Sequence, residues 1–466
     1  MNDLINKFGS IADLEVTEAD YQARGYHYAF RATGKNIPEV IKTFDEAGFY
    51  LEDMLCVDWV ERLDLVYFFF HYDHMLRVKA VLSVDPGKPV CPSCSDIFPN
   101  AYYLEREICE FFGVFFEGHR NLTYLFLHNA IDHYPLRKGR ILVPPEEKAR
   151  LDSYTVTEAD DTFFVNMGPQ HPSTHGVLRI IVKMEGEYIL EAEPVLGYLH
   201  RMQEKMGENR TYAQFLPNTG RMDYLGAMSF NLGYVTAVEK LLGIVPPERA
   251  EYIRIITTEL NRVSSHLLWV GAYLADLGAL TPFLFVFDDR EQILDILEGV
   301  TGSRLTYCYF RFGGVMNDVD EAFAEKTRAF VQRMRTERFG MYERLIAGNP
   351  IFISRTRDVG VVTRERARKY GLTGPALRST GHAFDMRKVE PYSLYDKMEF
   401  SIPTGQARGA IDMYQIRIRE MEMSLRIIEQ ALAALADGPV MAEKVPKKIK
   451  PPLGDVYHTV EMLWGE

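Results

Sequence analysis

The stretch "PPERAEYIRIITTELNRVSSHLLWVGAYL", residues 246–274, decides how the larger part of this chain folds. Two prolines, which suit the first turn of a helix, stand at its start. From there apolar residues recur at alternating spacings of three and four, which places them on one face of a helix; they are Ile253, Ile256, Leu260, Val263, Leu267, Val270 and Leu274. The pattern predicts a long helix with one face buried in a helical bundle.

Similar patterns on both sides of this stretch extend the prediction. Helices are expected over 288–300, opened by acidic caps, over 320–339, and over 409–438, where Gly438 ends the pattern. Upstream, residues 177–195 carry apolar residues on either side of a Glu-Gly-Glu turn, which predicts a β-hairpin. The chain from residue 151 is therefore predicted to be mainly helical, with a small β-sheet at its entrance.

The first part of the chain has a different pattern. Runs such as "LDLVYFFFHY" (63–72) alternate with amphipathic stretches such as "NIPEVIKTFDEAG" (36–48), which favours a small α+β domain. Residues 142–161 combine two prolines with many charges and suit a linker. A chain of 466 residues exceeds what one core usually supports. We therefore expect an α+β protein with domains at 1–150 and 151–466.

Composition narrows the class of protein. Apolar residues make up 47% and charged residues 25%, which is typical of a globular protein rather than a disordered one. The net charge is -12 and no basic run is present, so nucleic acid is not an expected partner. The amino terminus has neither a secretory nor a transit signal, which favours the cytoplasm. Asp276, Gly278 and Pro282 interrupt the apolar stretch 267–287, which favours a buried helix over a membrane span.

Several kinds of site have little support. The chain has no phosphate-binding loop, no nucleophile elbow and no Gly-x-Gly-x-x-Gly run, so it is not expected to bind NADH itself. Five cysteines do not suggest a disulfide framework. Cys91 and Cys94, in "CPSC", could form a redox dithiol or half a zinc site. A loop with two incidental thiols is favoured, because no second Cys-x-x-Cys follows.

The segment "GPQHPSTHGVLR", residues 168–179, holds His171 and His175 on a loop between predicted strands, where side chains can meet a ligand. A metal pair is disfavoured, because proline and glycine break the helix that would aim both imidazoles at one ion. Taken alone, each histidine is more often structural than functional.

Two further residues could act with this loop. Tyr224 stands in "NTGRMDYLGAM", close to Arg221, and Asp276 stands in an apolar helical stretch, where a buried carboxylate needs a partner. We hypothesise that Asp276 meets His175 and raises its proton affinity. By composition alone, Tyr224 could equally be a core aromatic residue and Asp276 a helix-packing ion pair.

Longer motifs carry a resemblance. The segments "NMGPQHPSTHGVLR", "GYLHRMQEKMGENRTYAQFLPNTGRMDYL" and "DLGALTPFLFVFDDRE" resemble the D subunit of respiratory complex I, a proton-pumping quinone oxidoreductase. The match covers nearly all of residues 162–434. The earlier segments "SDIFPNAYYLEREICEFFGVFFEGHRNL" and "YPLRKG" are similar to the C subunit of the same complex. The chain thus resembles a fusion of the C and D subunits.

The resemblance implies a fold and a site. The second domain would share the fold of a nickel-iron hydrogenase large subunit, with the former metal site now part of a quinone chamber. His175 and Tyr224 match the quinone head-group ligands, and Asp276 matches the acid associated with that histidine. His171 would shape the loop. Arg221 matches an arginine near the terminal 4Fe-4S cluster, which a neighbouring subunit holds, and this chain itself would bind no metal.

The resemblance also implies a setting. The substrate would be menaquinone or ubiquinone, and the electron donor, NADH or ferredoxin, would be selected by other subunits. Expected partners are the subunit with the terminal cluster and the membrane-arm subunit that completes the chamber. The chain would be peripheral, on the cytoplasmic face of the plasma membrane, and active only in the assembled complex.

Some features depart from the family. Thr306 stands where the family often has histidine. This difference puts a pH-dependent potential of the nearby iron-sulfur cluster in doubt and is consistent with a low-potential quinone such as menaquinone as the substrate. "CPSC" falls where aliphatic residues are usual. The family's last segment is expected to be missing after Glu466.

Two alternatives stay open. A hydrogenase-type large subunit needs two pairs of cysteine ligands, but after residue 150 the given sequence has only Cys308, and "LGYLHRMQEKM" (196–206) stands where the first pair would lie. The second pair would fall beyond Glu466. A non-catalytic assembly scaffold would not need His175, Tyr224 and Asp276 together. The first domain offers no evident reactive group.

Overall fold

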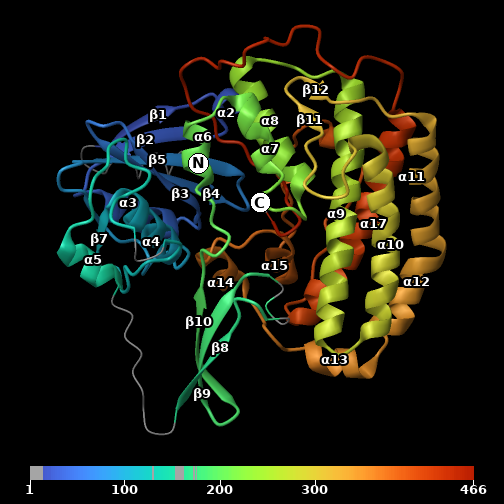
Figure 1. Cartoon of the computed structure of the whole chain (residues 1–466), viewed down its shortest axis with the longest axis horizontal. Helices are drawn as coiled ribbons and strands as arrows, with labels where there is room; N and C mark the ends of the chain where they lie inside the picture. Colours follow the sequence, from blue (N-terminus) through green and yellow to red (C-terminus); the bar gives the residue numbers. More distant parts are fainter. Residues whose placement is uncertain (1–13, 128–130, 153–161, 172–173, 175, 466) are drawn as a thin grey trace. The chain divides into compact units, whose positions relative to one another are not determined.

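The computed structural model describes residues 14–127, 131–152, 162–171, 174 and 176–465. The chain forms two compact units, which Figure 1 draws as ribbons. Unit 1 comprises the described residues up to 20, residues 26–209 and residues 369–371. Unit 2 comprises residues 21–25, 210–368 and the described residues from 372 onward. The predicted α+β class is confirmed, because unit 1 is built on sheets and unit 2 mainly on helices.

A five-stranded mixed sheet forms the core of unit 1, in the order β1-β2-β5-β4-β3. Its strands are β1 (Glu15–Glu18), β2 (Tyr28–Ala32), β3 (Tyr50–Asp58), β4 (Leu63–His71) and β5 (Leu76–Val84). Strands β2 and β5 are parallel, and the other neighbours are antiparallel. All nine residues of β4 are buried, which accounts for its run of aromatic and aliphatic residues. Phe44 of α3 (Ile37–Glu46) stacks on Phe69 of β4 with ring centroids 4.1 Å apart.

Two smaller sheets complete unit 1. The short strands β6 (Val90–Pro92) and β7 (Phe115–Glu117) pair in parallel on either side of α4 (Ala101–Phe112). Strands β8 (Phe163–Met167), β9 (Arg179–Glu185) and β10 (Tyr188–Val195) form an antiparallel sheet in which β9 is central. The predicted hairpin is therefore confirmed, and the histidine loop connects β8 to β9. Two short helices, α5 (Pro145–Asp152) and α6 (Gln203–Glu208), also belong to this unit.

Helix α9 (Glu248–Asp276) is the central element of unit 2 and packs against α10 (Leu280–Thr301) and α17 (Ala410–Ala434) (Figure 1). The predicted apolar stripe is confirmed, since all seven of its residues are buried. The other elements are α2 (Tyr21–Arg24), α7 (Tyr212–Thr219), α8 (Ala227–Leu242), β11 (Phe310–Arg311), β12 (Gly314–Val315), α11 (Glu321–Arg333), α12 (Phe339–Tyr342), α13 (Pro350–Thr356), α14 (Arg364–Lys369), α15 (Gly374–Ser379) and α16 (Met386–Val389). Two π-helical turns, Met334–Arg338 and Glu343–Ala347, follow α11 on either side of α12, the first inside the predicted helix 320–339 and the second after its end.

The helix predicted to begin at the acidic pair 288–289 begins earlier, at Leu280. Asp288 and Asp289 lie inside α10, and their carboxylates pair with Arg333 and Arg338, which are more than forty residues away. The expected acidic cap was wrong because these carboxylates serve tertiary ion pairs. Helix α17 also ends before the predicted Gly438, at Ala434.

We expected the apolar stretch 267–287 to form one buried helix, and this expectation is wrong. It contains the end of α9, a turn at 277–279 in which Gly278 has φ +84°, and the start of α10. No helix among the described residues is long and apolar enough to cross a membrane.

Candidate functional site

The histidine loop is held at its first residue by close backbone packing. Gly168 has φ +89°, and a Cβ at this position would overlap the carbonyl oxygen of Leu178 at the other end of the loop. The exposed His171 forms a β-bridge with Gly176, and its carbonyl accepts hydrogen bonds from the Thr174 amide (3.1 Å) and hydroxyl (2.8 Å). His171 therefore contributes its backbone to the turn of this loop. His175 lies outside the described residues.

Tyr224 lies in the turn between α7 and α8. A capping box of Thr211 and Gln214 starts α7, and the turn begins where the amide of Arg221 donates to the Asn218 carbonyl (3.0 Å). The Asp223 carboxylate then accepts from the amide of Leu225 (2.9 Å). The side chain of Tyr224 is 46% exposed, so the alternative of a core aromatic residue is wrong. Its exposed side chain suits contact with a ligand.

A buried asparagine of α9 holds this turn. Asn261 Nδ2 donates to the carbonyl of Leu225 (2.9 Å), and Oδ1 accepts from the amide of Met228 (3.2 Å). The oxygen and the nitrogen of this side-chain amide thus both bond the backbone on either side of Gly226, two residues after Tyr224. Sequence reasoning missed Asn261, although a polar residue inside an apolar helical pattern is a detectable signal.

Arg221 and Thr306 approach the same turn. Arg221 is exposed, and its guanidinium donates to the carbonyl of Pro217. Thr306 has φ +51°, and the next residue, Tyr307, lies so close to Gly220 that a Cβ there would be 2.6 Å from the Tyr307 carbonyl oxygen. The structure therefore brings together the two positions that the resemblance associates with the partner's iron-sulfur cluster.

Asp276 is placed differently from our expectation. It is the last residue of α9 and is exposed, so it is not a buried carboxylate in mid-helix. The helix ends there because the chain turns at Leu277 and Gly278. Asp276 belongs to unit 2 and the histidine loop to unit 1. The pairing of Asp276 with His175 stays a prediction.

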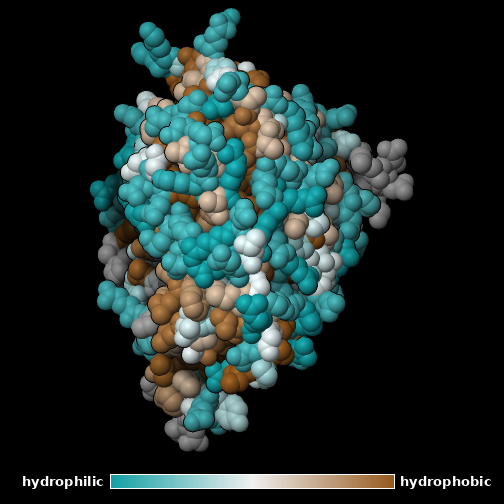
Figure 2. All heavy atoms as spheres, turned by 90° about the vertical axis from the view of Figure 1, so that its right-hand side faces the viewer, coloured by the Kyte–Doolittle hydropathy of each residue, from teal (hydrophilic) through white to brown (hydrophobic). Residues whose placement is uncertain are grey.

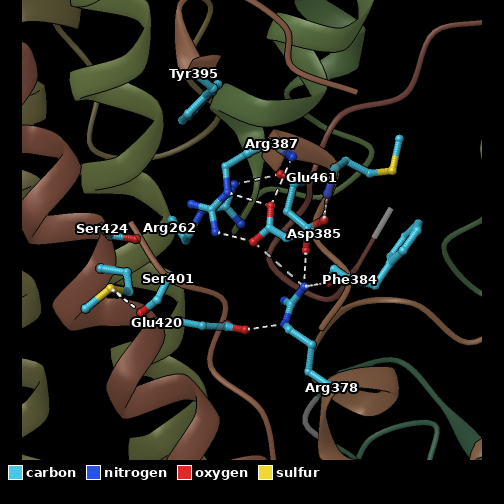
Figure 3. Close-up of polar contacts among 12 residues, drawn as sticks. Arg262, Arg378, Phe384, Asp385, Arg387, Tyr395, Ser401, Glu420, Ser424 and Glu461 are labelled. Carbon is cyan, nitrogen blue, oxygen red and sulfur yellow. Dashed lines mark hydrogen bonds and ion pairs between the residues drawn. The ribbon is translucent and has the colours of Figure 1, made fainter. Parts of the chain in front are cut away.

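Figure 3 shows a buried network of charged side chains around Arg387 and Asp385. Arg262, next to Asn261 on α9, donates to the carbonyls of Glu461 and Met462, both at 2.7 Å. The Glu461 carboxylate in turn accepts from Arg378 Nη1 (2.9 Å). The same segment packs against the turn, since a Cβ on Gly226 would be 2.9 Å from the Met462 side chain.

Opposite charges hold Glu259 and Asp385 of this network in their ionised form. Arg387 bridges Glu259 (3.0 Å) and Asp385 (2.6 Å). Burial raises the pKa of Glu259, but the charges of Arg387 and Arg262 outweigh it and bring that pKa to about 2. These carboxylates are fully paired anions at neutral pH. They suit a rigid support better than a proton donor.

His266 lies at the edge of this network, with Nε2 3.1 Å from the Glu420 carboxylate. Burial lowers the pKa of His266 to about 4, although Glu420 raises it. Burial raises the pKa of Glu420, but Arg378 and His266 bring it to about 2. A neutral imidazole therefore faces an ionised carboxylate at pH 7.

The described residues contain no group of three or more His, Cys, Asp or Glu side chains that could hold a metal ion. Cys91 and Cys94 are both buried in unit 1, and the Tyr67 hydroxyl lies 3.4 Å from the Cys91 sulfur. Burial raises the pKa of Cys91 to about 12, despite the lowering effect of Tyr67. A buried thiol of this kind is a poor nucleophile, which favours structural over redox thiols.

Comparison with known proteins identifies relatives for both parts of the chain. The family described as "Respiratory-chain NADH dehydrogenase, 49 Kd subunit" matches residues 276–465. The family described as "Respiratory-chain NADH dehydrogenase, 30 Kd subunit" matches residues 30–144.

Individual relatives cover more of the chain. The D subunit of the NADH-quinone oxidoreductase of Syntrophobacter fumaroxidans is 57% identical over 307 residues, which is 66% of this chain and 82% of the relative. This match is longer than the stretch from residue 276 to the end, so the similarity to the D subunit begins well upstream. A C/D subunit of the NADH-quinone oxidoreductase of Aquifex aeolicus, the one numbered 2, is 37% identical over 487 residues, covering 96% of this chain and 82% of the relative.

Proposed function

Because this chain belongs to the NADH-quinone oxidoreductase subunits of complex I, as a fusion of the C and D subunits, we propose that it forms part of the chamber in which quinone is reduced. The observation that carries the proposal is the exposed Tyr224, which stands on a turn held from below by Asn261. A rigid support with an exposed phenol is what the recognition of a quinone carbonyl requires.

The chemistry assigns a role to each side chain. Reduction of a quinone to a quinol takes two electrons and two protons, and negative charge develops on each carbonyl oxygen. The hydroxyl of Tyr224 donates a hydrogen bond to one carbonyl, and the imidazole of His175 donates to the other. The carboxylate of Asp276 orients that imidazole and stabilises its protonated form. Loss of a proton from His175 would then change its interaction with Asp276.

The electrons come from outside this chain. In the assembled complex a 4Fe-4S cluster held by a neighbouring subunit would supply them, and Arg221, which is exposed on this turn, would lie near that cluster. The crowding of Tyr307 against Gly220 supports the proposal, because it brings Thr306 to the same place. The donor upstream is NADH or ferredoxin, and the quinone is menaquinone or ubiquinone.

The proposed fold and setting follow the family. The part of the chain from residue 151 shares the architecture of a nickel-iron hydrogenase large subunit, and "LGYLHRMQEKM" (196–206) has no cysteine where the first pair of its metal ligands would lie. The chain acts only in the assembled complex, where it is peripheral and lies on the cytoplasmic face of the membrane. The chamber is completed by a membrane-arm subunit.

The proposal is tested with the assembled complex carrying Tyr224→Phe. We expect quinone reduction to fall at least tenfold, because one hydrogen bond to the developing oxyanion is lost. Electron transfer to an artificial acceptor upstream of the quinone should be unchanged. Tyr188→Phe, which removes a hydroxyl from another exposed tyrosine (79% exposed), is the matched control. Unchanged quinone reduction in Tyr224→Phe would support the assembly scaffold instead.

A further inference from the structure

Unit 1 contains a contact that the proposed quinone chemistry does not use. The part of the chain similar to the 30 Kd subunit, residues 30–144, shares this unit with residues 162–209 and with 369–371. We call residues 30–144 the C-like module. The segment Gly197–Glu208, which follows β10 and includes α6, packs against it.

Two buried charged residues of α4 form hydrogen bonds with the backbone of one loop. The Glu110 carboxylate accepts hydrogen bonds from three successive amides, those of residues 125, 126 and 127, at 2.9, 3.0 and 3.2 Å. The Arg106 guanidinium donates to the carbonyls of Thr123 (3.1 Å) and Tyr124 (2.8 Å). Because both side chains are buried, these bonds fix the conformation of residues 123–127 strongly.

The fixed loop presents an aromatic surface. The rings of Phe111 on α4 and Phe126 on the loop lie nearly parallel, with centroids 6.3 Å apart. His200 stacks on both rings, at 5.1 Å from Phe111 and 5.0 Å from Phe126. Burial lowers the pKa of His200, although Glu204 raises it, so the imidazole is neutral at pH 7 and packs as an aromatic ring. Gly197 lies so close to Phe126 that a Cβ there would overlap its carbonyl oxygen.

The second motif of the C-like module contacts the same segment. In "YPLRKG", the buried Arg137 bonds Asp58 (3.0 Å) and the Phe112 carbonyl (3.1 Å). Its own carbonyl accepts from Lys205 of α6 (3.5 Å), and Lys138 pairs with Glu208 at the end of α6. Both motifs that mark this module therefore meet one short segment.

A distant part of the chain also reaches this module. Lys369 donates to both carboxylate oxygens of Asp45, each at 2.6 Å. Gly371, with φ +60°, leaves no room for a Cβ, which would be 2.8 Å from the Leu51 carbonyl. Residues 369–371 belong to the region similar to the 49 Kd subunit.

We propose that Glu110 and Arg106 build a docking platform on the C-like module, and that this platform binds the segment Gly197–Glu208 through His200. The two modules then stay associated without the covalent link between them. The acidic and basic residues of "EREICEFFG" thus have a binding role in place of a reactive one. This inference is independent of the quinone site.

The test uses the full chain with a specific protease site inserted between residues 152 and 162. After cleavage, sedimentation over a dilution series measures how tightly the two pieces remain associated. We expect the cut wild-type pieces to sediment together and His200→Ala to weaken their association about tenfold, because two ring contacts are lost. His200→Phe should restore it. His133→Ala, whose ring pairs with Asp132, is the matched control.

Two variants test the platform and its coupling to His200. Glu110→Gln should weaken association as His200→Ala does, since the loop that carries Phe126 is freed. In a double-mutant cycle, Phe126→Leu with His200→Ala should weaken association by less than the product of the two single effects. His200→Leu replaces His200→Ala if the alanine variant does not fold, as judged by circular dichroism.

A second measurement uses the uncut chain. Hydrogen exchange of the amides of residues 125–127 should accelerate in His200→Ala and not in His133→Ala, because the stacked ring helps to hold the loop. The proposal is overturned if the cut wild-type pieces separate, if His200→Ala matches wild type, or if the two single effects multiply independently.

Discussion

Asp276 is exposed at the carboxyl end of α9, where the helix dipole disfavours a negative charge. A carboxylate at this place does not stabilise the helix. If Asp276 orients His175 as we propose, it contributes to quinone reduction rather than to the stability of the helix. One substitution can separate the effect on activity from the effect on stability.

We predict that Asp276→Asn lowers quinone reduction by the assembled complex about tenfold or more, because a charge-assisted hydrogen bond to the imidazole is lost. The free energy of unfolding should change by less than about 1 kcal/mol, because an unfavourable charge at the helix end is removed together with an exposed polar contact. Thermal unfolding and quinone reduction are measured side by side. Asp437→Asn, also exposed in unit 2, should change neither. A loss of stability that parallels the loss of activity would contradict the proposed role.

At the residue scale, sequence reasoning identified exposed candidate site residues better than the buried residues that hold them in place. Tyr224 was identified by resemblance and lies on an exposed turn, but its support, Asn261, was missed. The reason is physical, because Asn261 acts on a turn more than thirty residues away and no local pattern shows that contact. Asp276 was expected to be buried because its neighbours in sequence are apolar, whereas the chain turns immediately after it.

At the scale of single elements, helix α4 carries a further ionisable side chain, Glu107, beside the residues of the docking platform. Burial, together with the nearby charges of Glu204, Glu110 and Asp53, raises the pKa of Glu107 to about 7. The folded protein therefore keeps a proton on Glu107 between pH about 4.5 and 7 that the unfolded chain releases. Stability falls as pH rises through this window.

We predict that Glu107→Gln, which imitates the protonated form, stabilises the protein at pH 8 by on the order of 2 kcal/mol. At pH 4 the variant should equal wild type, because Glu107 is then protonated in both states. Thermal unfolding at the two pH values tests this difference. Glu187→Gln, in the exposed turn of the β9–β10 hairpin, should show no pH-dependent gain. Equal stability of Glu107→Gln and wild type at pH 8 would refute the prediction.

Helix α16 gives a second prediction through Arg387. Its removal leaves Glu259 and Asp385 buried without their main counter-charge. We predict that Arg387→Met costs about 3–5 kcal/mol of the free energy of unfolding. Arg328→Met, which removes an exposed ion pair with Glu321, should cost less than about 1 kcal/mol. Chemical denaturation compares the two variants, and equal costs would show that the network is not a support.

Elements with a strong repeating pattern were predictable, and their ends were often not. The stripe of α9 followed from spacing alone, because a helix buries residues three and four apart. The start of α10 was misplaced, since Asp288 and Asp289 resemble a helix cap but pair with Arg333 and Arg338 of a later helix. A local pattern cannot distinguish a cap from a tertiary ion pair.

For the whole molecule, family resemblance was more informative than any physical pattern. Composition and charge predicted a globular protein, and periodicity predicted its helices, but neither indicates a quinone. The assembly of unit 1 from three separate stretches, including residues 369–371, was not predicted, because it rests on contacts such as Lys369 with Asp45 across more than three hundred residues.

The α9–α10 turn leads into an apolar surface. Leu280 and Leu284 of α10 are each 65% exposed, and Ile351 of α13 is 63% exposed. Figure 2, which views the molecule from the side of α10 to α12, shows a broad brown area in its lower half below a mainly teal upper half. Exposed apolar residues such as these favour a protein or membrane contact. In our proposal the membrane-arm subunit is the partner.

We predict that Leu284→Lys releases the chain from membranes that retain wild type, because a charge would have to be desolvated in the apolar contact. Val245→Lys is the matched control. Val245 is 82% exposed just before α9 begins, whereas α10 follows its end, so the two sites are about 40 Å apart along this helix of 29 residues. The fraction of chain in the membrane pellet should fall for Leu284→Lys and stay at the wild-type value for Val245→Lys. If both variants pellet like wild type, this end of unit 2 does not face the membrane arm, and the quinone chamber must be closed from another side.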